Sequence, residues 1–344
     1  MDPLTQGALG AALPQATRRK AHVAVAGAFG FVAGMAADLD VLIRSDTDPL
    51  MFLEYHRQFT HALIFIPVGG LLCALALHWL LGRRWHLTYA QSFIFCSLGY
   101  ATHPFIDSAT SYGTLLFWPF SDERFSWSIV SVVDPLVTIP VVVLVALAGL
   151  RRSAVLARVA LAWVVLYLTA GVLQHQAATA MASQIAASRG HTPVRLEVKP
   201  SFANILVWRT IYETPERYYV DAVRVGLGPR VFEGVSVAKL DYGRDLPWLD
   251  PASQQARDVE RFRWFSDGFV AADPAHPNRI IDVRYSFLPN QITPLWSIEL
   301  TPEAPPTAHV RYRTHRERAR ENLGALWRMV VGGGEPVWRS TKAQ

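Results

Sequence analysis

The fold is decided first by residues 21–43, which read AHVAVAGAFGFVAGMAADLDVLI. This stretch is apolar over a length that can cross a hydrocarbon core as a helix, which takes about 20 residues. Its only carboxylates, Asp38 and Asp40, stand near its end. The stretch therefore predicts a membrane-spanning helix that carries two acidic side chains where it leaves the hydrocarbon.

Four more apolar blocks follow, at residues 62–82, 87–107, 129–150 and 155–175. The whole chain of 344 residues is 51% hydrophobic and only 18% charged, which is unusual for a water-soluble domain. We therefore expect an α-helical polytopic membrane bundle of about five transmembrane helices in residues 1–176. In the first block, Gly27, Gly30 and Gly34 predict a small-residue face on which a neighbouring helix packs closely.

The charges between the blocks indicate how the bundle is oriented. Eight basic residues fall on one side: Arg18, Arg19, Lys20, Arg83, Arg84, Arg151, Arg152 and Arg158. The loops of the other side hold Arg44, Arg57 and Arg124 among acidic residues. Because cytoplasmic loops are the ones rich in Lys and Arg, we expect the N-terminus in the cytoplasm and the C-terminal domain outside it. This topology also explains the net charge of +5, and we predict no nucleic-acid partner.

The chain changes character near residue 195. Residues 195–309 are Pro-rich with alternating patterns and predict a smaller β-rich extracytoplasmic domain, with strands around 204–212, 217–225, 280–287 and 295–300. Residues 310–344 form a basic tail, in which Arg311, Arg313, Arg316, Arg318 and Arg320 precede Leu323, Leu326 and Trp327. An amphipathic helix lying on a membrane and a solvated helix are both open for this tail.

Ionisable side chains gather at the ends of the apolar blocks that are expected to face outward. They are Asp38, Asp40, His56, His61, His103, Asp107 and Asp134. Any single pair is compatible with an ordinary polar helix end, but the whole set favours a metal site, because ionisable groups at membrane depth usually have a function. His103 and Asp107 are four residues apart, so on a helix they point the same way and can bind one ion or two adjacent ions.

The ligand types indicate which metal and which chemistry to expect. Three imidazoles with several carboxylates suit zinc, manganese or iron better than calcium or magnesium, because nitrogen ligands favour the borderline metals. The number of ligands allows one or two ions. Such an ion lowers the pKa of a bound water to about 7 and polarises a phosphoryl or acyl oxygen. No separate serine or cysteine nucleophile is evident.

Several short motifs occur in order along roughly the first 140 residues. They are Met1-Asp2-Pro3-Leu4-Thr5, Ala37-Asp38-Leu39-Asp40-Val41-Leu42, Tyr55-His56-Arg57-Gln58-Phe59-Thr60-His61, Thr102-His103-Pro104-Phe105-Ile106-Asp107, Ser111-Tyr112-Gly113-Thr114 and Trp118-Pro119-Phe120. In this order they resemble the YdjM/YbcI-type family of membrane-bound metal-dependent hydrolases, LexA-regulated proteins of the bacterial inner membrane. The resemblance implies that Asp38, Asp40, His56, His61, His103 and Asp107 occupy the metal positions, and Asp134-Pro135 matches a recurrent family element.

That family is distantly similar to zinc phospholipase C and P1-type nucleases, which implies phosphoester hydrolysis. One departure is Gln6, which stands where members often have a histidine. An amide is a much poorer zinc ligand than an imidazole. For Gln6 to reach the site, residues 3–14 must form a short helix directed back toward it.

The favoured hypothesis is hydrolysis of a phosphoester, such as a membrane lipid headgroup, with Arg57 as the phosphate clamp. A metal or proton transporter is the first alternative, but no internal repeat is evident and the ligands lie near one mouth of the bundle rather than at its midplane. A scaffold protein with a structural metal is the second, which a closed coordination shell would favour. The sequence leaves the substrate, the number of ions and the oligomeric state open.

Overall fold

The computed structural model describes residues 1–18, 20–226, 228–315, 317 and 319–333. The chain forms two compact units. The helical unit consists of Met1–Ile43, Tyr55–Leu173 and Phe202–Asn204, and the β unit consists of Arg44–Glu54, Gln174–Ser201 and the chain from Ile205 onward. The chain thus enters the β unit once, between residues 43 and 55, before it returns to the helical unit.

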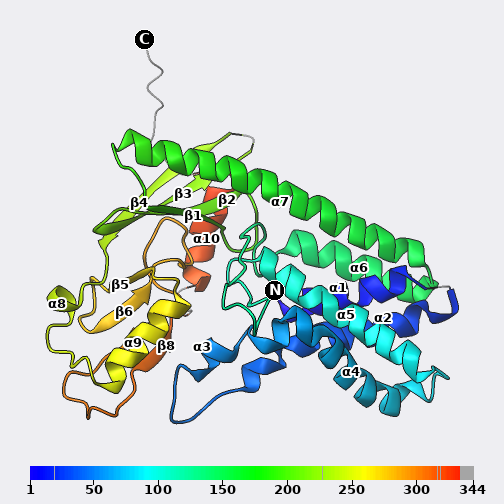
Figure 1. Ribbon diagram of the computed structural model, residues 1–344. Coiled ribbons are helices and arrows are strands. Elements are labelled where there is room, and N and C mark those ends of the chain that lie inside the picture. The colour runs from blue at the N-terminus through cyan, green and yellow to red at the C-terminus, as the bar shows by residue number, and fades with distance from the viewer. Residues whose placement is uncertain (19, 227, 316, 318, 334–344) are drawn as a thin grey trace. The chain divides into compact units, whose positions relative to one another are not determined.

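Apolar helices build the helical unit (Figure 1). The longer ones are α1 (Pro3–Ala16), α2 (Val23–Ala36), α4 (Ile66–Leu77), α5 (Tyr89–Ala109), α6 (Pro135–Arg151) and the first part of α7 (Ala154–Ser188). Short helical turns at Lys20–His22, Ala37–Leu42, Phe59–His61, Leu63–Phe65 and His78–Gly82 connect or extend them. Local signals set the helix starts. Asp2 caps α1 by accepting from the Thr5 N–H, and Thr88 and Gln91 form a capping box on α5.

Glycines let α1, α2 and α5 pack closely. A Cβ atom at Gly30 would lie 2.2 Å from the carbonyl oxygen of Gly10, and one at Gly99 would lie 2.4 Å from the carbonyl oxygen of Gly30. Side-chain atoms cannot come so close, so the three backbones meet with no side chain between them. The expected small-residue face is confirmed, and it brings α1 beside α5, which carries His103 and Asp107.

Three helical stretches among the described residues are long and apolar enough to cross a membrane: Val23–Leu42, Leu63–Gly82 and Ala154–Ser188. Apolar side chains such as Leu72 and Leu75 of α4 are exposed, as expected when lipid is the solvent. The helix α6 has only 17 residues, because Asp134-Pro135 starts it later than the expected block at residue 129. The helix α5 carries polar side chains such as His103 among its 21 residues. A count of five spans stays a prediction.

Two antiparallel four-stranded sheets form the described part of the β unit. The first has the order β1 (Arg195–Pro200), β2 (Val207–Glu213), β3 (Arg217–Arg224) and β4 (Arg230–Ala238), and the second β5 (Val270–Ala272), β6 (Arg279–Asp282), β7 (Trp296–Glu299) and β8 (Arg311–Thr314). Both sheets contribute to one core, in which Ile211 and Tyr218 meet Phe269 and Ile281. The expected β-rich domain is therefore confirmed, and its extracytoplasmic location stays a prediction.

The four expected strands correspond to β2, β3, β6 and β7, whereas β1, β4, β5 and β8 were not expected. Two of these, β1 and β8, read RLEVKP and RYRT, so charged residues obscure their alternation. The helices α8 (Tyr242–Asp245) and α9 (Gln254–Phe265) also lie in this region.

The tail is not a single helix, because its first part pairs with β7 as strand β8. A helix, α10 (Ala319–Val330), follows; the expected tail residues Arg316 and Arg318 lie outside the described residues. Within α10, Leu326 and Met329 are buried while Leu323 and Trp327 are exposed. A helix in this second part agrees with the expected helical tail, whereas two of the three apolar side chains expected on its face, Leu323 and Trp327, are exposed.

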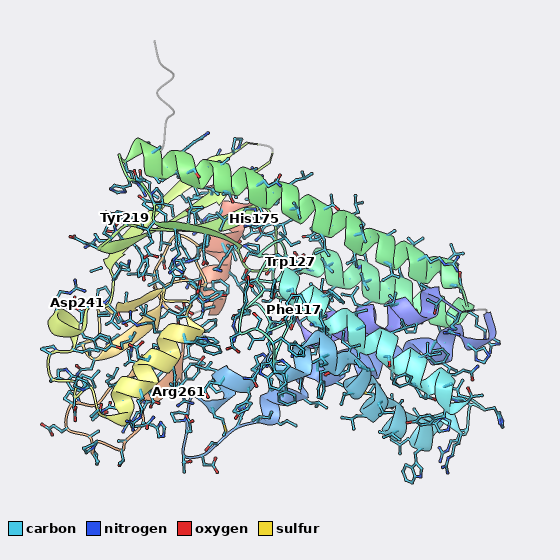
Figure 2. The ribbon with its side chains drawn as sticks, in the orientation of Figure 1. Phe117, Trp127, His175, Tyr219, Asp241 and Arg261 are labelled. Atoms are coloured by element: carbon cyan, nitrogen blue, oxygen red, sulfur yellow. The ribbon has the colours of Figure 1, made fainter. Side chains whose placement is uncertain are left out.

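One arginine holds the segment Arg44–Glu54 in the β unit. Arg261 of α9, labelled in Figure 2, donates to both carboxylate oxygens of Asp48, at 2.9 and 2.7 Å, and to Glu54 at 2.5 Å. Such forked arginine–carboxylate pairs are stronger than single contacts. Partial burial would raise the pKa of Asp48, but the hydrogen bonds from Arg261 outweigh it and hold this pKa below its usual value. The segment includes most of α3 (Met51–Tyr55).

Candidate metal centre

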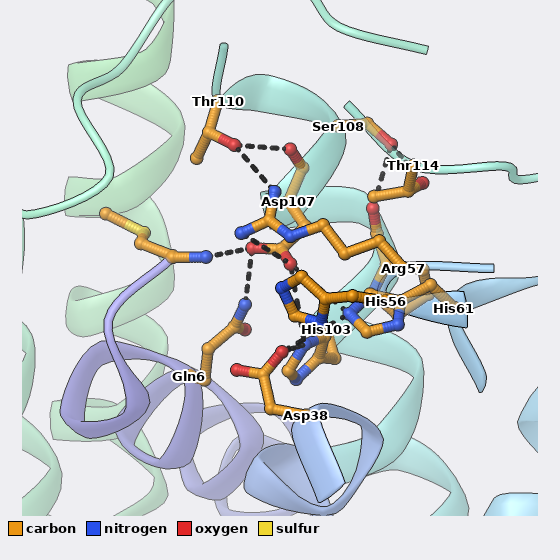
Figure 3. Close-up of polar contacts among 12 residues, drawn as sticks. Gln6, Asp38, His56, Arg57, His61, His103, Asp107, Ser108, Thr110 and Thr114 are labelled. Atoms are coloured by element: carbon orange, nitrogen blue, oxygen red, sulfur yellow. Dashed lines mark hydrogen bonds and ion pairs between the residues drawn. The ribbon is translucent and has the colours of Figure 1, made fainter. Parts of the chain in front are cut away.

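Four side chains of the helical unit converge at one point (Figure 3). Asp38 comes from the turn Ala37–Leu42, His61 from the turn Phe59–His61, and both His103 and Asp107 from α5. The Nε2 atom of His61 lies 3.5 Å from Oδ1 of Asp38 and 3.4 Å from Oδ2 of Asp107. The Nε2 atom of His103 lies 3.3 and 3.5 Å from the same two oxygens. We call these four residues the inner group.

Four of the six separations between the ligand atoms of the inner group match those around a tetrahedral ion, and all six are below 4.8 Å. Bonds of about 2.0–2.1 Å in a tetrahedron place neighbouring ligand atoms about 3.3–3.4 Å apart. The observed separations of 3.3–3.5 Å agree. They exceed the usual length of a good N–H···O hydrogen bond. The distances between the four atoms therefore suit binding of one shared cation better than hydrogen bonds between the atoms themselves.

The hydrogen bonding of the same atoms tests this fit. Asp38 Oδ1, His61 Nε2, His103 Nε2 and Asp107 Oδ2 are buried and have no hydrogen-bond partner among the residues that the structure describes. Leaving one buried polar atom unsatisfied costs about 1–3 kcal/mol. Four such atoms directed at one point would be satisfied together by one ion. The donor set, two imidazole nitrogens and two carboxylate oxygens, suits zinc, and also manganese or iron.

Supporting contacts orient the two imidazoles. The Nδ1 atom of His103 lies 2.6 Å from the carbonyl oxygen of Gly34, so it must carry the proton and leave Nε2 as the ligand atom. The Nδ1 atom of His61 lies 2.9 Å from Oγ1 of Thr60 and 3.4 Å from Oδ2 of Asp40. Both histidines therefore present Nε2 to the point where the carboxylates converge.

A second set of possible ligands shares Asp38 with the inner group. One atom each of Asp38, Asp40 and His56 lie within 4.8 Å of one another, and we call these three residues the outer group. Oδ1 of Asp40 lies 2.7 Å from Nδ1 of His56. Oδ2 of Asp40 accepts from the Arg57 N–H at 2.9 Å and from the Thr60 hydroxyl at 2.8 Å. Six of the seven expected metal residues thus lie in these two groups.

The seventh expected residue, Asp134, lies in neither group. Its carboxylate caps α6, where Oδ1 accepts from the Leu136 N–H at 3.1 Å. Its Oδ2 accepts from the Tyr167 hydroxyl at 2.8 Å. An aspartate directly before Pro135 is a common helix start, so this signal could have indicated a capping role for Asp134.

Arg57 lies beside the inner group, as its expected role as a phosphate clamp requires. Its Nη2 is 3.2 Å from Oδ2 of Asp107, and its Nη1 donates to the Thr110 hydroxyl at 3.2 Å. The Nε atom is buried without a hydrogen-bond partner in the described chain. The backbone of Arg57 is left-handed, with φ 63°. This uncommon conformation is held by the Arg57 N–H donating to Asp40 and by the Arg57 carbonyl accepting from the Leu115 N–H.

Gln6 also reaches the site, because α1 covers residues 3–16 and packs against α2 and α5. Its Nε2 donates to Oδ1 of Asp107 at 2.7 Å. The same oxygen contacts the α-amino group of Met1. The short helix that Gln6 required is confirmed, whereas the contact of Met1 was not expected. Both groups donate to the oxygen of Asp107 that faces away from the two imidazoles and so leave Oδ2 for the ion.

Apolar membrane-length helices together with buried, converging His and Asp side chains define a class: a helical membrane protein with a candidate metal site. The chain belongs to the YdjM inner membrane protein family, whose family model matches residues 1–178. This region contains every residue of the inner and outer groups.

The chain is also similar to inner membrane protein YbcI of Escherichia coli (strain K12). The two are 33% identical over 108 residues, which are 30% of this chain and 60% of that protein. The chain therefore spans about three fifths of the length of this curated relative. No solved structure matches the chain. The names of the family and the relative give a location, the inner membrane, and no reaction.

Proposed function

We propose that this protein is a membrane-bound, metal-dependent hydrolase of phosphoesters of the phospholipid kind. The observation that carries the proposal is the inner group, whose four ligand atoms are buried, converge, and have no hydrogen-bond partner among the described residues. A buried guanidinium, that of Arg57, lies beside them and forms an ion pair with Asp107. An ion bound there would supply a water of lowered pKa, about 7, and would polarise a phosphoryl oxygen. Zinc suits the ligands best, and manganese or iron are the other candidates.

Arg57 is the residue that we assign to the phosphate. Its side chain is almost fully buried at 6% exposure, and its Nε lacks an acceptor in the part of the chain described. A guanidinium binds phosphate oxygens in a forked geometry. Because Nη2 is 3.2 Å from a carboxylate oxygen of the inner group, a phosphate that reaches the ion would also reach Arg57.

A lipid-like substrate is supported by the apolar side chains next to the ligands. Leu39 and Leu42 neighbour Asp38 and Asp40 in sequence, and they are 62% and 74% exposed. Phe105, two residues after His103, is 49% exposed. An amphiphilic molecule could place its apolar part against these side chains and its headgroup at the ion. The charge distribution of the loops further supports a site at the outer face of the membrane.

The inner group also favours a second candidate, a structural metal. Four protein ligands around a tetrahedral ion form a closed shell, which is usual for structural zinc, whereas catalytic zinc keeps a position for water. In that case the protein would be a membrane scaffold whose metal only holds the turn Ala37–Leu42, the turn Phe59–His61 and α5 together. Asp38 is the ligand best placed to yield a position to water, because its side chain is 21% exposed while the other three are buried.

The test uses full-length protein in lipid nanodiscs, loaded with zinc and assayed for metal content and phosphodiester cleavage. His61→Ala and His103→Ala are expected to lose both. His86→Asn is the matched control, because His86 is exposed, and it should keep both. Wild type that holds zinc but cleaves no phosphodiester lipid would support the structural metal, and wild type that takes up no metal on reconstitution would refute the proposal.

A further inference from the structure

Asp38 is shared by two sets of ligands, and this sharing has a consequence for the number of ions. We propose that the outer group, Asp38, Asp40 and His56, binds a second cation, with the Asp38 carboxylate bridging the two ions. Oδ1 of Asp38 faces the two imidazoles of the inner group, which leaves Oδ2 for the outer ion. The second cation site is inferred from the geometry of the outer group, and its use in catalysis rests on the proposed function.

The contacts of Asp40 prepare one of its oxygens for a cation. Oδ2 already accepts from the Arg57 N–H and the Thr60 hydroxyl, so the carboxylate is held at that end. Within the described residues, the hydrogen-bond neighbour of Oδ1 of Asp40 is Nδ1 of His56, at 2.7 Å. Two ligand atoms this far apart, each about 2.0–2.1 Å from an ion, subtend an angle of about 80–85°. Such an angle belongs to five- or six-coordinate geometry rather than to a tetrahedron.

The two groups differ in their access to solvent. His61, His103 and Asp107 are fully buried, whereas the His56 side chain is 32% and the Asp38 side chain 21% exposed. The outer ion would have three protein ligands and hence open positions for water and substrate, as catalytic sites do. The inner ion would have four protein ligands, of which Asp38 is the one that can yield a position to water. Two-metal sites of this kind bind the attacking and leaving oxygens of phosphoesters.

A second arrangement fits the same distances and predicts a different number of ions. If Nδ1 of His56 carries a proton and donates it to Asp40, the outer group is a hydrogen-bonded pair and no second ion binds. Counting bound ions separates the two arrangements directly.

The experiment measures metal per chain in nanodisc-embedded, full-length protein that has been loaded with zinc and dialysed. Wild type and His86→Asn should hold two ions per chain, and His56→Ala one. Asp40→Asn serves only as a supporting variant. Asp40 lies 3.4 Å from His61 of the inner group, so its replacement can affect both ions. After manganese loading, electron paramagnetic resonance should show a coupled pair in wild type and an isolated ion in His56→Ala. The one ion kept by His56→Ala shows that this variant is folded.

One ion in both wild type and His56→Ala, with an uncoupled manganese spectrum, would overturn the second site. A wild type that holds one ion and still cleaves phosphodiesters would overturn it while leaving the proposed function intact. Two ions without cleavage of any phosphodiester would confirm the second site and contradict the proposed function. Failure to bind any ion would overturn both.

Discussion

Nε2 of His103 lies 3.5 Å from Oδ2 of Asp107, one turn later on α5, and neither atom has a hydrogen-bond partner in the described chain. A helix places side chains four residues apart on one face, so this pair is set by local structure. His61 and Asp38 complete the set from elsewhere in the chain. Local helix geometry therefore places two ligands of the inner group, and tertiary packing brings the other two beside them.

Replacing Asp107 by asparagine should reduce zinc affinity by at least about 100-fold. The change removes a ligand charge and also leaves the buried Arg57 guanidinium, 3.2 Å away, without its carboxylate. Competition with a chromogenic chelator measures the affinity.

The control for this variant is Asp134→Ala. Asp134 caps α6 and accepts from Tyr167, so zinc affinity should stay unchanged while stability falls by about 1–3 kcal/mol. Loss of zinc in Asp134→Ala would mean that Asp134 acts on the metal site after all.

Gln6→Leu should lower zinc affinity about tenfold. Gln6 donates to Oδ1 of Asp107 at 2.7 Å, and groups that orient a ligand typically change metal affinity about 10–100-fold when removed. Gln15→Leu is the matched control, because Gln15 is a buried glutamine on the same helix and its Nε2 donates to the Val145 carbonyl. Equal affinities of the two variants would contradict a role for Gln6.

Arg57→Lys should keep the metal and lower kcat/KM for a phosphodiester about 10- to 100-fold. Lysine retains the charge but cannot form the forked contact of a guanidinium. Steady-state kinetics with metal content measured on the same sample tests this, with Arg151→Lys at an exposed position of α6 as control. An unchanged kcat/KM would remove Arg57 from the phosphate site.

Gly30→Ala should destabilise the helical unit strongly, because the added Cβ would lie 2.2 Å from the Gly10 carbonyl oxygen and must push α1 and α2 apart. Gly149→Ala should be tolerated, since its Cβ would meet only the side chain of Gln15, at 3.6 Å. Thermal unfolding in nanodiscs compares the two. Similar melting temperatures would show that the close approach of α1 and α2 is not required.

Asp48→Asn should destabilise the β unit by about 1 kcal/mol at pH 7. The pKa of Asp48 is lowered in the folded protein, so its contribution is fully present above the unfolded value of about 3.9 and is lost as pH falls through the folded value. The difference in melting temperature between wild type and variant should thus be constant from pH 7 to 5 and shrink below about pH 4. A difference that persists at pH 3 would exclude the ionised carboxylate as its source.

Much of the candidate site could be predicted from the sequence because charged side chains in apolar blocks are few. Asp38, Asp40, His56, His61, His103 and Asp107 were all expected as metal residues, and all of them lie in the inner or outer group. Asp134 was expected for the same reason, but its carboxylate serves a helix start. The place of a residue at the end of an apolar block indicates how deep in the membrane it lies. It does not indicate which side chains point toward one another.

The apolar helical blocks, the placement of His103 and Asp107 on one helix face, and the β-rich character of the second region follow from local length and periodicity, so they could be predicted from the residues alone. The contact of Gln6 with Asp107 and the sharing of Asp38 by two groups depend on tertiary packing and could not be read from local patterns. Tertiary packing also decided that residues 311–314 form a strand rather than part of a helix. These features depend on which backbones can approach, as at Gly10 and Gly30, and on strand partners distant in sequence, which local periodicity does not encode.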